Sequence, residues 1–250
     1  MTIVFQHLRN TQNIGDRWCS PYDYFDWENA EAKDLRVPSN TAYDVGIYGG
    51  GKIFGTLADQ VGIVKNSGTY HIAWGVSTVQ SMPFSPKYNR SKRICHLVGS
   101  RDWGDQRFDY APCVSCMSPL FDNPSAPQHD VVFYAHGGKT KQQKIEIPDH
   151  IPTNTNNCDT LEDAISFIAS GATVISNSYH GVYWALLLGR KTICIPFSNK
   201  FSKYRKSPHY AKPKTWLNDL DKGKAYPDML DISREATLKF KSKVDDVLNT

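Results

Sequence analysis

Short apolar runs that end in glycine-rich or polar turns recur along the first half of the chain. Their length and their β-branched and aromatic residues are typical of buried strands in a parallel sheet. The runs are TIVFQH from residue 2, AYDVGIYGGG from residue 42, YHIAWGVS from residue 70 and ICHLVGSRDWG from residue 94. Since ligands bind beyond the carboxyl ends of such strands, each run predicts a loop that can contact a ligand.

A second series of elements follows a segment rich in Pro, Asn, Ser and Asp near residues 112–129, which we interpret as a linker. The strand VVFYAHGG comes next. A helix is then expected after Asp159 or Thr160, either of which can cap its first turn, with Gly171 following its end. From Asp231 onward, apolar residues at helical spacing predict an amphipathic closing helix.

Residues 172–197 predict a βαβ unit. A strand ends at Ser176, a polar cluster and a helix follow, and a second strand runs from Lys191 to Phe197. Alternation of strands and helices in both halves predicts an α/β fold with two Rossmann-like lobes facing each other across a cleft.

We place the N-terminal lobe at residues 1–118, the C-terminal lobe at residues 128–232 and the closing helix at residues 233–250. The hydrophobic fraction is 40%, and no apolar run approaches the roughly 20 residues of a membrane span. The segment after Met1 lacks the features of a secretory signal. We therefore expect a soluble, cytoplasmic protein.

Six cysteines are spread along the chain and are expected to be reduced. Cys113 and Cys116 form a C-x-x-C pair, but no second pair follows at zinc-finger spacing. A packed loop is the expected structure there, and we predict no metal site. The net charge of +4 indicates only mild attraction to anions.

Three candidate sites lie in the first half. The segment NIGD places Asn13, Gly15 and Asp16 after the first strand, where Asp16 can cap a helix or accept a proton from a substrate hydroxyl. The glycines at 49–51 can present backbone N–H groups to an anion. Arg101 can hold a carboxylate or phosphate with its planar fork, or can form an ion pair with Asp102 or with the other lobe.

The segment SNSYHG, after Ser176, is the strongest local candidate. Ser178 can cap the following helix, whose N-terminus favours an anion. His180, in the first turn, can contact that anion or act as a general acid or base. Asn177, Tyr179 and Gly181 complete the cluster.

The segment 200–214 contains six of the chain's lysines and arginines, interleaved with Phe201, Tyr204 and Tyr210 and followed by Trp216. Such a mixture suits an anionic membrane surface, a lipid diphosphate or an acidic polysaccharide, and it is also found in solvated basic loops. We rank nucleic acid last, because no binding motif accompanies the charge.

Taken in order, NIGD, YGGG, AWGVS, SRDWG and the late block from ISNSYHG to FSNKF resemble the polysaccharide pyruvyl transferase family over roughly residues 11–202. The resemblance implies a two-lobed GT-B-like fold, with the acceptor in the N-terminal lobe and the donor in the C-terminal lobe. It also implies transfer of the pyruvyl group of phosphoenolpyruvate onto a sugar of a cell-surface polysaccharide, as a ketal and without a further cofactor.

The same resemblance implies roles for individual residues. His180 would be the general acid or a phosphate contact, Arg101 would lie near the donor carboxylate, and Asp16 would orient the acceptor hydroxyl. Many members of the family have arginine where this chain has Ser178, as in an SFHG-type subgroup, and the chain is short for the family. The donor carboxylate would then rely on Arg101, Lys191 or Lys200.

We therefore expect a cytoplasmic transferase with a small-molecule donor and a free or lipid-linked saccharide acceptor, without nucleic acid. Segment 200–214 would allow peripheral contact with the inner face of the membrane. One alternative is a GT-B glycosyltransferase that uses a nucleotide sugar. A second is a noncatalytic carbohydrate-binding relative whose donor site has decayed.

Overall fold

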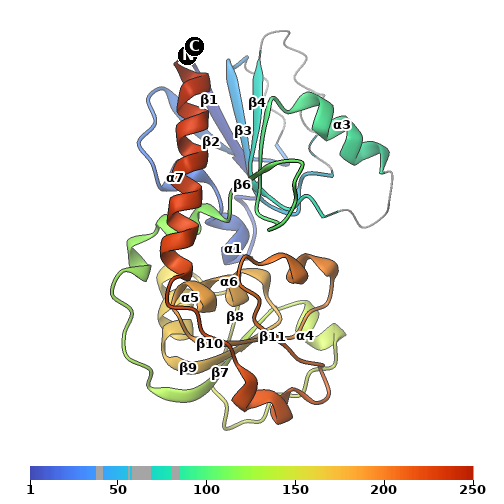
Figure 1. The fold of residues 1–250 in the computed structure, drawn as a ribbon, viewed down its shortest axis with the longest axis vertical. Coiled ribbons are helices and arrows are strands. Elements are labelled where there is room, and N and C mark those ends of the chain that lie inside the picture. Colours follow the sequence, from blue (N-terminus) through green and yellow to red (C-terminus); the bar gives the residue numbers. More distant parts are fainter. Residues whose placement is uncertain (38–41, 56, 58–68, 80–84, 250) are drawn as a thin grey trace. The chain divides into compact units, whose positions relative to one another are not determined.

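Two parallel sheets, one of six strands and one of five, organise the chain into two units (Figure 1). The computed structural model describes residues 1–37, 42–55, 57, 69–79 and 85–249. The first unit comprises residues 1–11, 16–115 and 234–250, and the second comprises residues 12–15 and 116–233. The α/β class with two Rossmann-like units is thus confirmed. The division after Ser115 falls inside the predicted linker.

The first sheet has the strand order β2-β1-β3-β4-β5-β6, with every neighbouring pair parallel. Its strands are β1 (Ile3–His7), β2 (Ala30–Asp34), β3 (Val45–Gly51), β4 (Tyr70–Val76), β5 (Leu97–Ser100) and β6 (Asp109–Tyr110). The chain proceeds to one side of β1 and then to the other. The switch between β1 and β3 is the point where sheets of this order commonly bind ligands.

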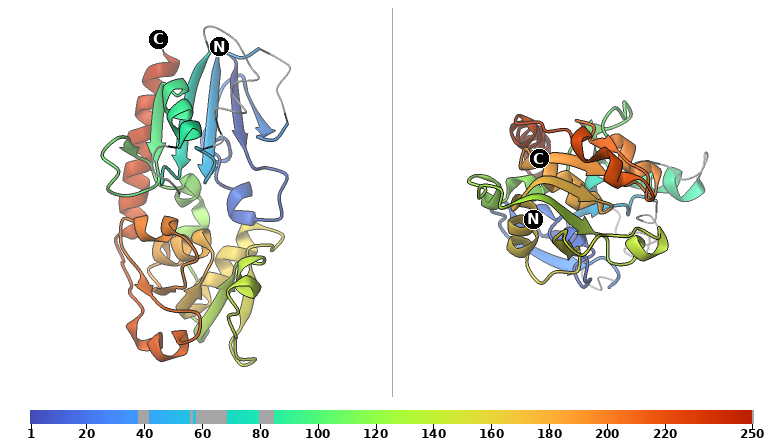
Figure 2. Two further views of the ribbon diagram at one scale, coloured as in Figure 1. Left: turned by 90° about the vertical axis from the view of Figure 1, so that its right-hand side faces the viewer. Right: turned by 90° about the horizontal axis from the view of Figure 1, so that it is seen from below.

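Both faces of the first sheet are covered. On one face, helix α7 (Met229–Leu248) contributes Phe240 and Val244 to a core with Phe5 and Trp74, and Figure 2 shows the helix running beside the strands. On the other face, helix α3 (Pro86–Ile94) packs through its buried Tyr88. Burial on both sides explains why the central strands are nearly all apolar.

The second sheet is also parallel, in the order β11-β10-β9-β7-β8. Its strands are β7 (His129–Ala135), β8 (Thr153–Thr155), β9 (Gly171–Ser176), β10 (Lys191–Cys194) and β11 (His209–Tyr210). Here the switch lies between β7 and β9. The order along the chain therefore repeats that of the first five strands of the first sheet.

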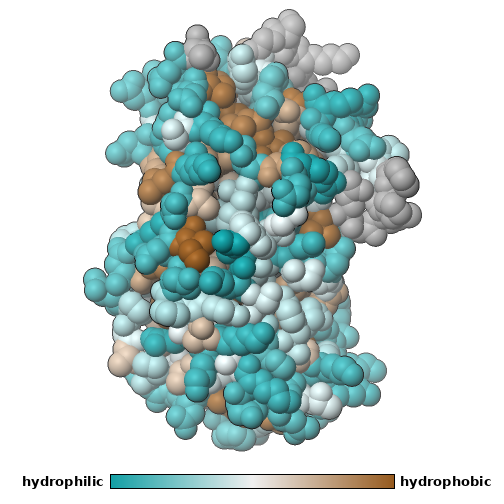
Figure 3. All heavy atoms as spheres, viewed as in Figure 1, coloured by the Kyte–Doolittle hydropathy of each residue, from teal (hydrophilic) through white to brown (hydrophobic). Residues whose placement is uncertain are grey.

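Helices and short 3-10 turns complete the second unit. Aromatic contacts of Tyr134 with Phe167 and Trp184 place α5 and α6 against one face, while Trp216 packs on Phe133 at the other. The elements are α4 (Lys139–Gln142), α5 (Leu161–Ala169), α6 (Tyr179–Leu187), η2 (Val114–Met117), η3 (Pro119–Phe121), η4 (Asn199–Lys203) and η5 (Trp216–Lys222). Two further short turns, α1 (Ile14–Arg17) and η1 (Pro21–Asp23), follow β1. Hydrophilic residues cover most of this unit on the face drawn in Figure 3.

Several local predictions can be compared directly with the structure. Thr160 caps α5 in a capping box, in which its hydroxyl accepts from the amide of Asp163 at 3.0 Å and the Asp163 carboxylate accepts from the amide of Thr160 at 3.1 Å. The strand that begins at Lys191 ends at Cys194, before Pro196 and Phe197. In α7, Leu238 is exposed, although it was counted in the apolar stripe. No helix in the described part of the chain has the length and apolar character needed to cross a bilayer.

Candidate functional site

The carboxyl edge of the second sheet gathers the loops after β7 and β9, the two strands at its switch point. Asn177, directly after β9, is fully buried and links the loops. Its Oδ1 accepts from the amide of His136 at 2.8 Å and from the Thr140 hydroxyl at 3.1 Å, and its Nδ2 donates to Oε1 of Gln143 at 2.9 Å. Three hydrogen bonds from one buried amide fix the shape of this edge.

His180 lies in the first turn of α6 and is only 4% exposed. Its ring packs against Trp184, with centroids 5.5 Å apart, and edge-on against Tyr179. Gly15 faces the same ring: a Cβ atom on Gly15 would lie 2.0 Å from Nδ1 of His180. The amide of Ile14 donates to the carbonyl of Asn156 at 2.8 Å, which holds this short segment in the second unit. The glycine of the NIGD motif thus meets the histidine of the SNSYHG motif.

The start of α6 is built by small side chains. The Ser176 hydroxyl donates to the carbonyl of Tyr134 at 2.6 Å and accepts from the amide of Ser178 at 3.0 Å. Ser178 occupies the N-cap position, but its side chain makes no capping hydrogen bond, contrary to the predicted cap. Gly181 is required by close packing, because a Cβ atom there would lie 2.4 Å from Cδ1 of Tyr134.

Aromatic rings and lysines border this edge after β10. The ring of Tyr179 stacks on Tyr204 at 4.8 Å, and its carbonyl accepts from the Tyr204 hydroxyl at 2.9 Å. The ammonium of Lys200 lies 4.8 Å from the ring centroid of Phe197 and 5.8 Å from that of Tyr179. Lys200 is therefore at the predicted donor side, close to Tyr179.

Lys191 is placed elsewhere. It is the first residue of β10 and pairs with Thr173, whereas the candidate edge follows Cys194, which pairs with Ser176. The side chain at 191 thus belongs to the amino end of the strand. In segment 200–214, Phe201 and Tyr204 are buried, as is Trp216 just beyond it, and Tyr210 is exposed. Peripheral membrane contact would consequently depend mainly on the cations.

The first unit brings Asp16 and the glycines of β3 around Cys19. The thiol of Cys19 donates to the carbonyl of Asp16 at 3.0 Å, and a Cβ on Gly50 would lie 2.4 Å from Sγ. A Cβ on Gly51 would lie 3.5 Å from Oδ1 of Asp16. Gly50 and Gly51 have φ of 39° and 79°, a region that glycine adopts readily. Gly50 therefore serves the packing of the Cys19 side chain, whereas the sequence predicted that these glycines present amides to an anion.

Asp16 lies within the first turn of α1, so it is not the cap of that helix. Burial is the main cause that raises the pKa of Cys19, followed by the nearby Cys113 and Asp16, while the charge of Arg101 opposes the rise. These interactions place Asp16 and Arg101 in one neighbourhood of the first unit. Asn13 belongs to the loop before α1, in the second unit.

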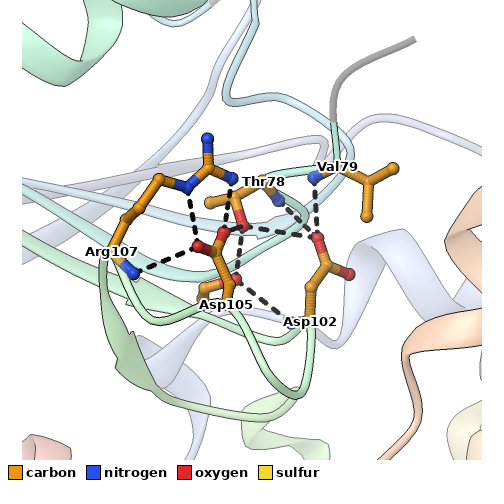
Figure 4. A network of polar contacts seen from close by, with 6 residues as sticks. Thr78, Val79, Asp102, Asp105 and Arg107 are labelled. Atoms are coloured by element: carbon orange, nitrogen blue, oxygen red, sulfur yellow. Dashed lines mark hydrogen bonds and ion pairs between the residues drawn. The ribbon is translucent and has the colours of Figure 1, made fainter.

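Arg101 follows β5 and is 3% exposed. Its neighbour Asp102 holds the loop after β4: the carboxylate accepts from the Ser77 hydroxyl at 2.9 Å and from the amides of Thr78 and Val79 at 2.6 and 2.8 Å (Figure 4). Asp102 thus has a structural use beyond the ion pair with Arg101 considered from sequence. Its network fixes the backbone from which Arg101 projects.

A second carboxylate extends this network. Asp105 accepts from the Thr78 hydroxyl at 2.6 Å and binds Arg107 through both guanidinium nitrogens, at 2.7 and 2.8 Å. Burial alone would raise the pKa of Asp105, but these hydrogen bonds lower it more, and the net pKa is lowered. The carboxylate therefore stays ionised near neutral pH.

The C-x-x-C pair lies in a packed region, as predicted. Cys113 and Cys116 are buried free thiols, and burial raises the pKa of Cys113. Within the described ranges, no group of three or more His, Cys, Asp or Glu side chains is placed to hold a metal ion.

Three residues at the second sheet's edge were missed from sequence: His136, Lys139 and Phe197. A signal was present, because the strand before HGGK ends much as the strand before GGGK at Gly49 does. Asn156 was also missed. Its Oδ1 accepts from the amide of Gly137 at 2.8 Å and supports the loop after β7.

Comparison with known proteins adds a single distant likeness. No protein-family model and no curated protein matches the chain. Among solved structures, the chain is similar to a protein from Listeria monocytogenes described as a candidate UDP-N-acetylglucosamine 2-epimerase, with 9% identity and a TM-score of 0.43. The likeness covers 78% of this chain and 67% of the other.

Proposed function

We propose that the protein is a transferase of cell-surface polysaccharide biosynthesis that moves the pyruvyl group of phosphoenolpyruvate onto sugar hydroxyls. The contact between Gly15 and His180 carries the proposal. The two motifs most responsible for the resemblance to polysaccharide pyruvyl transferases, far apart in sequence, contribute to one place in the second unit. This supports a shared function for them.

The chemistry assigns each residue a task. His180 gives a proton to the methylene carbon of the donor, and one sugar hydroxyl oxygen then bonds to the cationic C2 while its proton passes to Asp16. A second hydroxyl of the same sugar displaces inorganic phosphate from C2, which completes the ketal. Arg101 holds the donor carboxylate through its guanidinium.

Turnover tests this proposal. The purified protein is incubated with phosphoenolpyruvate and a panel of oligosaccharides, and both the release of inorganic phosphate and the ketal, by mass spectrometry, are measured. We expect wild-type turnover, its loss in His180→Ala and its retention in His150→Ala, a control at an exposed histidine of the same unit. Equal turnover in His180→Ala and wild type would exclude the assigned role of the histidine.

A nucleotide-sugar glycosyltransferase is the second candidate. It is favoured by the half-buried ring of Phe197, which lies beside Lys139 and Lys200 at the same sheet edge. An aromatic face next to cations suits a nucleotide base with a diphosphate. Release of a nucleoside diphosphate from a nucleotide sugar, without ketal formation, would select this candidate. Saccharide binding without turnover of any donor would select the noncatalytic relative.

A further inference from the structure

Three basic side chains meet at the ring of Phe197 in the second unit. The ammonium groups of Lys200 and Lys139 lie 4.8 and 5.7 Å from the ring centroid. The imidazole of His136 meets the same ring edge-on, with centroids 5.5 Å apart and planes at 84°. His136 and Lys139 follow β7, and Phe197 and Lys200 follow β10. Loops on either side of β9 thus converge on one point.

Attraction between one cation and an aromatic ring explains a single lysine at Phe197. It does not explain a second ammonium and an imidazole there, because like charges in a small volume repel one another. The repulsion is visible in His136: burial is the largest cause that lowers its pKa, and the charges of Lys200 and Lys139 lower it further. A cluster of this kind attracts an anion.

The sequence around the cluster strengthens its positive potential. After Asp163 the next acidic residue is Asp219, so β9, α6, β10 and η4 contain no carboxylate. The ammonium of Lys139 donates to Oε1 of Gln142, a neutral partner, at 2.8 Å. Positive charge here is consequently little reduced by the surrounding segment.

The cluster stands on a rigid support. The amide of His136 is held by the buried Asn177, and the amide of Gly137 by Asn156, which is also buried. Both supports lie at the carboxyl edge of the sheet, next to its switch point, where open α/β sheets bind ligands. A preformed group of basic side chains loses little conformational entropy when an anion binds.

We propose that His136, Lys139 and Lys200 form a binding site for a phosphoryl group, with the flat part of the same ligand against Phe197. The inference rests on the proposed function for its natural ligand, which is the phosphate of phosphoenolpyruvate. A nucleotide diphosphate shares this chemistry and is separated from it by the test.

The test is isothermal titration calorimetry at fixed pH and ionic strength with three probes: inorganic phosphate, phosphoenolpyruvate and UDP. Lys139→Gln and Lys200→Gln are compared with Lys141→Gln and Lys203→Gln. Each control removes the same charge from the same element, α4 or η4, at an exposed position. Thermal unfolding of every variant verifies that it is folded, and Lys139→Ala and Lys200→Ala replace any glutamine variant that is not.

We expect Lys139→Gln and Lys200→Gln to weaken the binding of phosphoenolpyruvate at least tenfold, while the controls stay within twofold of wild type. Phe197→Ala should weaken phosphoenolpyruvate or UDP more than inorganic phosphate. Tight binding of UDP but not of phosphoenolpyruvate would keep the phosphoryl site and assign it to a nucleotide donor.

Equal weakening in the cluster variants and the controls would overturn the inference, because only general surface charge would then be acting. Absence of binding of all three probes to wild type would overturn it as well. Neither result decides the proposed function, whose test is turnover that depends on His180.

Discussion

The backbone of Gly15 lies against the imidazole of His180, so closely that no side chain fits between them. An added Cβ atom would stand 2.0 Å from Nδ1 and 2.3 Å from Cγ. Gly15→Ala must therefore displace the ring. We expect turnover to fall about 100-fold, because small misplacements of a catalytic group have effects of this size.

The displacement can be seen independently of turnover in the NMR signals of a histidine-labelled protein. Gly55→Ala is a suitable control, since no heavy atom lies within 4 Å of an added Cβ there. Unchanged His180 signals in Gly15→Ala would contradict the packing described here.

Asn177→Ala should lower the free energy of unfolding by about 3 kcal/mol. It removes three hydrogen bonds and leaves the amide of His136 without its acceptor. Asn177→Asp keeps both accepted bonds and should have a smaller effect on stability in urea denaturation. Equal losses in the two variants would show that the acceptor atom does not matter.

Asp102→Ala should destabilise the first unit by about 3 kcal/mol, because the hydroxyl of Ser77 and two backbone amides lose a buried acceptor. Asp105→Ala, whose partner Arg107 is half-exposed, should cost about 1 kcal/mol. Guanidinium denaturation monitored by tryptophan fluorescence gives both values. A larger loss in Asp105→Ala than in Asp102→Ala would refute this ranking.

Acid should destabilise the protein through His71. Burial, and then the charge of His96, lowers the pKa of His71 from 6.5 to about 4, and Nδ1 is hydrogen-bonded to the Tyr48 hydroxyl at 3.0 Å. Between pH 6.5 and 4 the unfolded chain binds a proton at this site that the folded chain does not, so stability falls as the pH falls.

His71→Asn should remove about 2 kcal/mol of the stability difference between pH 7 and pH 4.5. His150→Asn, at an exposed position, should leave the difference unchanged. Urea denaturation at the two pH values measures it. The same difference in wild type and His71→Asn would remove His71 from this explanation; His7, whose pKa burial and Arg9 also lower to about 4, would be examined next.

Central strands could be predicted because burial on both faces leaves long apolar runs, as in GIYGGG of β3. The edge strands could not, since β2 has the sequence AEAKD and β8 has TNT, and neither carries an apolar pattern. Their place in the sheets depends on pairing with β1 and β7. Boundaries at Lys191 and Cys194 were similarly set by the register of β10 on β9.

In the candidate site, His180 and Asn177 could be found because they follow a strongly apolar strand. His136, Lys139 and Phe197 gain significance only from their convergence, which depends on the strand order β10-β9-β7. Cys19 is a similar case. Nothing in its sequence neighbourhood indicates that its thiol packs against Gly50.

The contribution of α7 to the first sheet affects how the chain is made. Phe240 and Val244 complete the core around Phe5 and Trp74, yet they follow the whole of the second unit in sequence. Units usually fold in the order of synthesis. Here, the ribosome must translate every strand of the second unit before the first can close its core, so the unit that begins the chain is the last to be finished.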